Sequence, residues 1–273
     1  MKASSRTQNF AALVWGAVIG ILGGLIGLGG AEFRLPVLVS VFKFRTLNAI
    51  VVNLIVSLVT VIFSFIFRSG FAGFDRIAEN WSVVVNLLAG SLIGSFAGVH
   101  LATKINEHLL HKVVVVLLVC LSFVLIGHEF IFAQSVFQFV PAVQIIIGFI
   151  AGLVIGLVSS MLGVAGGELI IPTIILLYGV DVKLAGSLSL AISIPTIIMG
   201  LIRYRQNQRI SEAVTDKLFI VLMSIGSIIG ALLGSYLLRF APSALLQIGL
   251  GIILLASAIK LARKPSAKAS AEP

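Results

Sequence analysis

The segment GAVIGILGGLIGLGGAEFRLP (16–36) decides the fold, because the chain repeats it as GLVIGLVSSMLGVAGGELIIP (152–172). The two segments are 136 positions apart and share eight of 21 residues without a gap. The shared pairs are Gly16/Gly152, Val18/Val154, Ile19/Ile155, Gly20/Gly156, Gly27/Gly163, Gly30/Gly166, Glu32/Glu168 and Pro36/Pro172. Apolar composition alone would not align glycine, glutamate and proline in one register, so the match predicts an internal duplication.

The same offset extends the match beyond these two segments. It also pairs Ala49/Ala185, Leu54/Leu190, Ser57/Ser193, Thr60/Thr196, Gly90/Gly226, Ser91/Ser227, Gly94/Gly230, Gly98/Gly234 and Leu101/Leu237. We therefore predict a first repeat at 10–132 and a second at 143–262, joined by a loop at 133–142 and flanked by residues 1–9 and 263–273.

The composition places both repeats in a membrane. Of the 273 residues, 59% are hydrophobic and 11% charged, whereas a soluble domain has about 45–50% apolar and about 25% charged residues. Soluble enzymes, nucleic-acid-binding domains and secreted disulfide scaffolds are thereby excluded. The net charge of +9 does not indicate a nucleic-acid partner, because the basic residues cluster between apolar runs, which is typical of membrane topology.

Five apolar runs in each half predict an all-α integral membrane protein. They are 10–28, 33–42, 47–67, 82–102 and 113–132, then 143–162, 169–179, 184–202, 218–238 and 243–262. A full span needs about 20 residues, so the short runs 33–42 and 169–179 either cross at an angle or re-enter. We interpret the first run as a retained span, the alternative being a signal peptide.

The basic residues predict the orientation of each half, because lysine and arginine accumulate on the cytoplasmic side. If each short run counts as a crossing, the cytoplasmic group is Lys2, Arg6, Lys43, Arg45, Lys104, Lys112, Arg203, Arg205, Arg209, Lys217, Lys260, Arg263, Lys264 and Lys268. The outside group is Arg68, Arg76, Lys183 and Arg239, and Arg34 lies within the membrane. Loops at matching places in the two halves have opposite biases in their content of basic residues, which predicts two inverted repeats of five helices. Both termini are then cytoplasmic, and the expected location is the cell (inner or plasma) membrane.

The glycine-rich stretches are the candidate binding site. Glycine weakens a helix, and a short helix after each break would point its N-terminal amides at an anion. We expect Gly27, Gly29, Gly30, Gly163, Gly166 and Gly167 to bind substrate, Pro36 and Pro172 to fall in the first turns of the short helices, and Pro195 to break a later one. The alternative is that these glycines only allow close helix packing. We assign packing to Gly90, Gly94, Gly98, Gly226, Gly230 and Gly234.

The charged residues after the breaks allow several roles. Glu32 and Glu168 either cap the short helices, pair with Arg34 in the case of Glu32, or take up protons during transport. Arg34 suits an oxyanion because its fork bonds two oxygens, and Ile170 stands at its place in the second half. Asn53, Ser189 and Ser193 are candidates to complete the hydrogen bonding of an anion.

Enzyme signatures are missing from the sequence. It has neither an HExxH zinc motif nor a GxxxxGK[ST] phosphate loop, and we expect no catalytic residue, cofactor or metal. The expected partners are a small anionic substrate and the lipid bilayer, with a homo-oligomer left open.

The doubled motif GGLIGLGGAEFRLPVLVSVF and SSMLGVAGGELIIPTIILLYG resembles that of the TauE/SafE sulfite exporter family, also called the toluene sulfonate uptake permease family. The resemblance covers about residues 10 to 262 and implies a carrier of sulfite or related sulfur anions, driven by an ion gradient. It assigns Gly27, Gly163 and their neighbours to the substrate region. The charged residues Glu32, Arg34 and Glu168 depart from the more apolar runs common in that family. Alternatives are an anion channel and a non-transporting assembly or sensor subunit.

Overall fold

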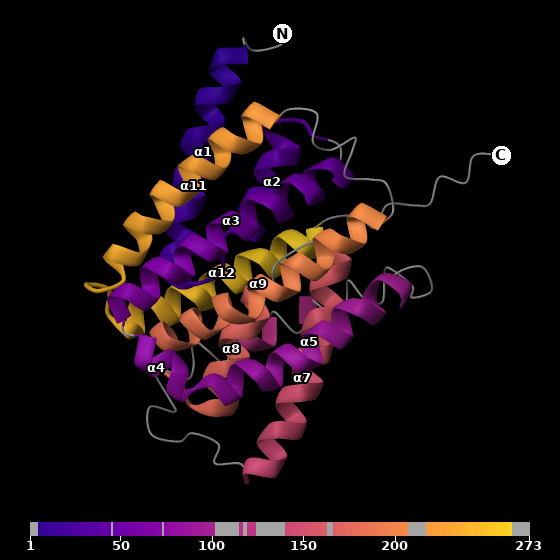
Figure 1. Cartoon of the computed structure of the whole chain (residues 1–273), viewed down its shortest axis with the longest axis vertical. Helices are drawn as coiled ribbons and strands as arrows, with labels where there is room; N and C mark the ends of the chain where they lie inside the picture. Colours follow the sequence, from indigo (N-terminus) through magenta and orange to yellow (C-terminus); the bar gives the residue numbers. More distant parts are fainter. Residues whose placement is uncertain are drawn as a thin grey trace, which may run out of the picture.

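The computed structural model describes residues 5–44, 46–72, 74–101, 115–116, 119–123, 140–162, 166–206 and 217–263 (Figure 1). Every regular element in these ranges is an α-helix. The first half contains α1 (Ser5–Ile26), α2 (Ala31–Ser40), α3 (Thr46–Ala72), α4 (Phe74–Glu79) and α5 (Trp81–Leu101). The second half contains α7 (Pro141–Leu162), α8 (Gly167–Tyr178), α9 (Val182–Gln206), α11 (Lys217–Leu237) and α12 (Ser243–Arg263).

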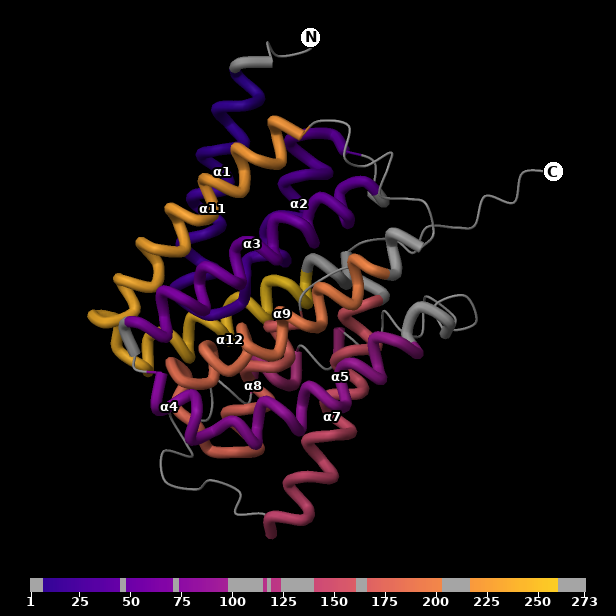
Figure 2. The backbone as a smooth tube through the Cα atoms, in the orientation of Figure 1, coloured from indigo at the N-terminus to yellow at the C-terminus, as the bar shows by residue number. Residues whose placement is uncertain are grey.

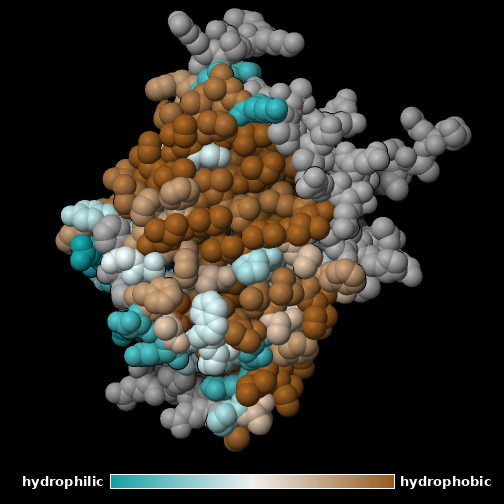
Figure 3. Space-filling model, in the orientation of Figure 1, coloured by the Kyte–Doolittle hydropathy of each residue, from teal (hydrophilic) through white to brown (hydrophobic). Residues whose placement is uncertain are grey.

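The all-α membrane class predicted from the sequence is confirmed. Within the described residues, five helices are long and apolar enough to cross a membrane, namely Thr7–Ile26, Asn48–Gly70, Pro141–Ser160, Val182–Ile202 and Lys217–Leu237. Hydrophobic side chains cover much of the face that α1, α11 and α3 present in Figure 3. Each expected apolar run corresponds to a helix except 113–132, which lies largely outside the described residues. The sequence did not predict α4.

Two helix pairs join the halves, because α1 packs on α11 and α5 packs on α7. Glycines make both contacts close. A Cβ atom added at Gly20 of α1 would lie 2.9 Å from the Cα of Ser227 in α11, and one added at Gly156 of α7 would lie 2.7 Å from the Cα of Ser91 in α5. The packing role expected for Gly90, Gly94, Gly226, Gly230 and Gly234 is confirmed, since each faces the backbone of the partner helix.

The contacts of one pair reappear in the other when shifted by 136 positions. Gly16 faces Met223 as Gly152 faces Leu87, and Gly230 faces Ala17 as Gly94 faces Leu153. The sequence duplication is therefore matched by a duplication of contacts. Residue numbers increase together along both members of each pair, so α1 runs parallel to α11, and α5 runs parallel to α7.

The matching first helices of the two halves enter from opposite ends of the molecule. Figure 2 traces α1 downward from the N-terminus at the top, whereas α7 starts at the lower end and runs upward. The short helices α2 and α8 each follow their long neighbour directly along the chain.

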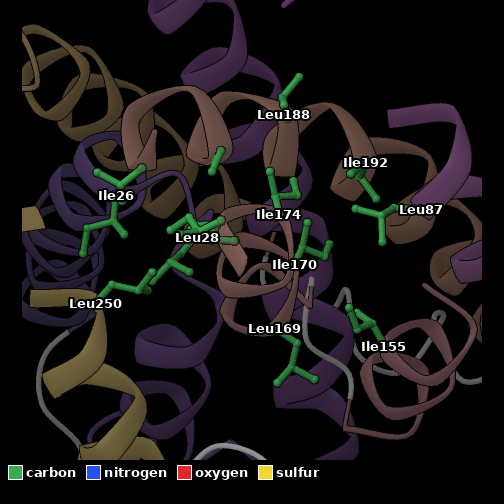
Figure 4. Close-up of a cluster of buried hydrophobic side chains, with 14 of the residues drawn as sticks. Ile26, Leu28, Leu87, Ile155, Leu169, Ile170, Ile174, Leu188, Ile192 and Leu250 are labelled. Carbon is green, nitrogen blue, oxygen red and sulfur yellow. The ribbon is translucent and has the colours of Figure 1, made fainter. Parts of the chain in front are cut away.

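A large cluster of buried hydrophobic side chains extends across the two halves. It contains Ile26 and Leu28 at the end of α1, Leu87 of α5, and the inward faces of α8, α9 and α12. Figure 4 shows Leu28 in the same cluster as Ile170 and Ile174 of α8. Because residues from both halves bury the same surface, the two repeats form one folded unit.

The glycine contacts predict a selective loss of stability in Gly230→Ala. The new Cβ would lie 2.9 Å from the carbonyl carbon of Ala17 and closer still to its oxygen, and overpacking of this kind costs about 1–3 kcal/mol. We expect the melting temperature of the purified protein to fall by about 5 °C. Gly249→Ala in α12 is the matched control, because no atom lies within 4 Å of its added Cβ. An equal melting temperature in both variants would contradict the close packing of α1 on α11.

Candidate functional site

Both short helices begin directly after a glycine in the left-handed conformation. Gly27, Gly29 and Gly30 have φ angles of 93°, 80° and 75°, and Gly166 has a φ of 77°. L-residues with side chains rarely adopt these values, so the break requires glycine at these positions. The two glycines that precede α2 and α8, Gly30 and Gly166, occupy matching positions of the repeat. Gly163 lies outside the described residues.

The break of the first half lies directly against the second half. A Cβ added at Gly27 would lie 2.6 Å from the Cα of Gly186 in α9. One added at Gly167, the first residue of α8, would lie 3.1 Å from the Cα of Leu28. The starts of α2 and α8 are thereby brought together at the contact between the halves, although the sequence separates them by 136 positions.

The expected position of two prolines is wrong. Pro36 and Pro172 lie inside α2 and α8, beyond the first turn, because the helices begin at Ala31 and Gly167, immediately after the left-handed glycines. A proline there has no N–H to donate to the carbonyl four residues earlier. Those carbonyls belong to Glu32 and Glu168, so both helices carry a locally weakened first turn. Pro195 likewise lies inside α9, which continues past it to Gln206.

Arg34 of α2 is fully buried in a cage of hydroxyl groups. Its Nη1 donates to the Oγ of Ser57 at 2.7 Å, and its Nη2 donates to the Oγ1 of Thr60 at 3.0 Å and the Oγ of Ser227 at 3.2 Å. Ser57 and Thr60 come from α3, while Ser227 comes from α11 of the second half. The exposed fraction of Arg34 is 0%, so its charge is held away from water.

The three hydroxyl groups are oriented to accept from Arg34. Thr60 donates its own proton to the carbonyl of Val56 at 2.8 Å, and Ser227 donates to the carbonyl of Gly16 at 3.2 Å. Ser57 points its proton at the Oδ1 of Asn53 at 3.5 Å. The lone pairs of these oxygens can therefore face the guanidinium. The cage thus holds the positive charge of Arg34 with neutral hydroxyl groups.

The charge of Arg34 has no direct counter-ion among the residues that the structure describes. Its hydrogen-bond partners are all neutral, and its Nε atom is buried without a partner. Glu32 acts on it only at longer range. Because a buried charge is costly unless it is paired, this guanidinium would be stabilised by an anion.

The positions that the repeat relates to the Arg34 cage also carry hydroxyl groups, but without an arginine. Ser91 and Thr196 correspond to Ser227 and Thr60, and their hydroxyl oxygens lie 3.4 Å apart. Ile170 occupies the place of Arg34 and is buried in the hydrophobic core. The site is therefore asymmetric, with one cationic and one apolar member.

The two glutamates stand in the first turns of α2 and α8 and are close enough to interact electrostatically. The Oγ of Ser257 donates to the Oε1 of Glu168 at 3.4 Å. Both carboxylate oxygens of Glu32 are buried without a hydrogen-bond partner, and no salt bridge joins Glu32 to Arg34 in the described part of the chain. The cap expected of Glu32 thus lacks a side-chain hydrogen bond, although its charge still favours the helix N-terminus.

The remaining candidate residues are buried along α3 and α9. Asn53 and Ser189 have exposed fractions of 0% and stand at matching positions of the repeat. Asn53 accepts from Ser57, which in turn accepts from Arg34. The Oγ of Ser189 is buried without a partner, and Ser193 is buried close by on α9.

Sequence reasoning missed two residues of this region. The distribution of basic residues predicts an outside segment for Arg68, but α3 extends to Ala72 and buries its side chain completely. The apolar residues around Arg68 could have indicated the longer helix. Ser227 was recognised only as a repeated serine in a glycine stripe, because nothing in the sequence places α11 beside α2.

Comparisons with known proteins agree with the doubled motif. A family model described as sulfite exporter TauE/SafE matches residues 2–125 and 147–273. The "Probable membrane transporter protein YdhB" of Bacillus subtilis (strain 168) is 22% identical over 240 residues, which make up 84% of this chain and 90% of that protein. No solved structure matches the chain. The family match and the apolar helices identify a multi-pass membrane transporter. The resemblance inferred from the glycine-rich repeats is confirmed: the chain belongs to the TauE/SafE family.

Proposed function

We propose that the protein is a secondary transporter of a small anion, with sulfite or a related sulfur oxyanion as substrate. The observation that carries this proposal is Arg34, a fully buried guanidinium with only neutral partners and an unpartnered Nε. An oxyanion offers several acceptor oxygens to such a fork. The names of the matching family and of the relative from Bacillus subtilis support a transporter of this kind.

The starts of the two short helices add donors near the same point. The amide of Arg34 bonds the carbonyl of Gly30 at 3.0 Å, and the amide of Ile170 bonds that of Gly166 at 3.0 Å. The amide of Leu169 also bonds the carbonyl of Gly166 at 3.0 Å. The amides of the residues at the very start of each helix belong to first turns, which leave N–H groups without helical acceptors. These partial positive charges favour an anion at the contact between the halves.

Alternating access between inverted halves is the proposed mechanism. The opposite courses of α1 and α7 support inversion, as do the contacts that recur at an offset of 136 positions. Two halves of opposite orientation have inward- and outward-facing arrangements of similar energy around a shared site. We propose that both termini lie in the cytoplasm, on the side where lysine and arginine accumulate.

Reconstitution tests the transport function directly. Proteoliposomes that contain only this chain should take up labelled sulfite, and unlabelled sulfite on the opposite side should accelerate that uptake by counterflow. Flux that does not saturate and shows no counterflow would indicate a channel. A protein that binds sulfite without moving it would indicate a non-transporting subunit.

We further propose that Glu32 and Glu168 couple transport to protons. Glutamine resembles a protonated glutamate, so Glu32→Gln and Glu168→Gln should flatten the pH dependence of sulfite uptake. If protonation is required for transport, wild-type uptake rises as the pH falls, while the variants stay near one rate from pH 5 to pH 8. The measurement is initial uptake into proteoliposomes without a membrane potential.

The control for this prediction is Glu79→Gln, which changes an exposed carboxylate of α4 and should leave the pH profile unchanged. If both Glu32→Gln and Glu168→Gln keep the wild-type profile, the carboxylates only stabilise the helix N-termini.

A further inference from the structure

Arg68 holds together three helices at the end of the molecule where α1 and α3 end and α9 begins. Its Nη1 donates to the carbonyls of Gly24 and Leu25 at 2.9 and 3.0 Å. Its Nη2 donates to the carbonyl of Lys183 at 2.5 Å, and its Nε donates to the Oγ of Ser187 at 3.1 Å. We call this set of five residues the Arg68 clamp. The arginine of the clamp is buried, with an exposed fraction of 0%.

The clamp depends on the glycine break of the first half. In an uninterrupted helix, the carbonyls of Gly24 and Leu25 would accept from amides four residues further on. Those amides belong to Leu28 and Gly29, which lie in the break after α1 ends at Ile26. Arg68 supplies the donors that the break removes, and its positive charge also suits the C-terminal end of a helix.

The clamp crosses the contact between the two halves. Gly24 and Leu25 belong to the first half and lie one turn before Gly27, whereas Lys183 and Ser187 belong to α9. Gly186 lies between them, and a Cβ added to it would lie 2.7 Å from the Nη2 of Arg68. Gly27 also packs on Gly186. Separation of α1 from α9 at this point would therefore break the hydrogen bonds of Arg68.

All hydrogen-bond partners of Arg68 are neutral carbonyl or hydroxyl groups, and Asp181 acts on it only at longer range. These hydrogen bonds hold the buried guanidinium in place as long as α1 and α9 stay together. When α1 and α9 separate, water can solvate both the guanidinium and the released carbonyls, so the open arrangement is accessible as well. The clamp thus has the properties of a reversible closure.

We propose that Arg68 is a positioning residue that holds the carrier closed on the side of the membrane where α3 ends and α9 begins. This inference rests on the proposed transport function, because a closure matters only if α1 and α9 separate during transport. At an offset of 136 positions the sequence places Tyr204, which carries no cationic group. The arginine is therefore not repeated at the matching position of the second half.

Thiol labelling tests the clamp without any need for transport. In a Cys120→Ser background, which removes the exposed native cysteine, Ser64→Cys provides a buried reporter. Ser64 lies one turn before Arg68 on α3, with an exposed fraction of 0% and an unpartnered Oγ. A membrane-impermeant maleimide should modify the reporter slowly. Arg68→Ala should accelerate the modification at least tenfold, and only when the reagent is added on the side of α3's C-terminal end.

Two further variants control this experiment. Arg76→Ala removes an exposed arginine of nearby α4 and should leave the labelling rate unchanged. Arg68→Lys keeps the charge but loses the fork, so its rate should lie between those of the wild type and Arg68→Ala. If Arg68→Ala does not fold, Arg68→Lys and Ser187→Ala must still show the one-sided increase. Unchanged labelling, or an equal increase from both sides, would overturn the clamp.

Transport and binding assays separate a positioning role from a substrate-binding role. Arg68→Ala should lower net sulfite uptake at least tenfold, because the carrier stays open to one side, while the sulfite affinity of detergent-purified protein changes by less than about twofold. A large loss of affinity would overturn the positioning role. One-sided labelling in a protein that moves no anion would refute the transport function and leave the clamp contacts intact.

Discussion

Arg34→Ala is expected to lose anion binding almost completely while the protein still folds. Removal of one partner from a buried charged pair costs about 2–5 kcal/mol, so the affinity for sulfite should fall by about 100-fold or more. Folding should persist because Ser57, Thr60 and Ser227 each keep an acceptor within their own surroundings. The measurement is sulfite binding by calorimetry, together with the shift in melting temperature that sulfite produces.

The matched variants separate charge from geometry. Arg34→Lys keeps a cation without a fork and should lose an intermediate amount of affinity, whereas Ser227→Ala removes one of three hydrogen bonds and should lose less. Arg76→Ala changes an exposed arginine and should bind sulfite normally. If Arg34→Ala binds sulfite as tightly as the wild type, the anion site is elsewhere and the buried guanidinium has only a structural role.

Gly27→Ala is expected to have the largest effect on the fold of the site. The added Cβ would lie 2.5 Å from the carbonyl oxygen of Gly186 and 2.7 Å from its carbonyl carbon. The φ angle of 93° adds a strain of about 1–3 kcal/mol for a residue with a side chain. Because both neighbouring atoms are backbone, they cannot move aside as a side chain would. We expect a melting temperature lower by about 10 °C and no measurable uptake.

Gly70→Ala provides the control for this effect. Gly70 lies in α3, and no atom is within 4 Å of its added Cβ, so the substitution should leave melting and uptake close to those of the wild type. Normal uptake by Gly27→Ala would show that the contact of the break with α9 is not needed for transport.

The membrane class, the duplication and the two glycine breaks could be predicted from the sequence because each leaves a local pattern. Long apolar runs need only their own residues to indicate a span, and Gly30 and Gly166 mark the helix starts at matching positions. The starts of the short helices could not be predicted from Pro36 and Pro172, because a left-handed glycine starts each helix earlier than the preference of proline for the first turn suggests.

The contacts of the site could not be predicted, because they join helices that are distant in the sequence. The cage around Arg34 requires Ser227 of α11, and the clamp of Arg68 requires Lys183 and Ser187 of α9. Both arginines are bound by neutral groups, so no opposite charge in the sequence indicates their partners. Only the spatial arrangement of the helices reveals these contacts.

The pairing of α1 with α11 has a consequence for biogenesis. The first helix leaves the ribosome long before its partner, and at about 5–20 residues per second the delay is on the order of 10 to 40 seconds. During that time the glycine-lined face of α1 must be shielded by lipid or by the insertion machinery. The N-terminal half therefore cannot reach its final packing until α11, in the last third of the chain, enters the bilayer.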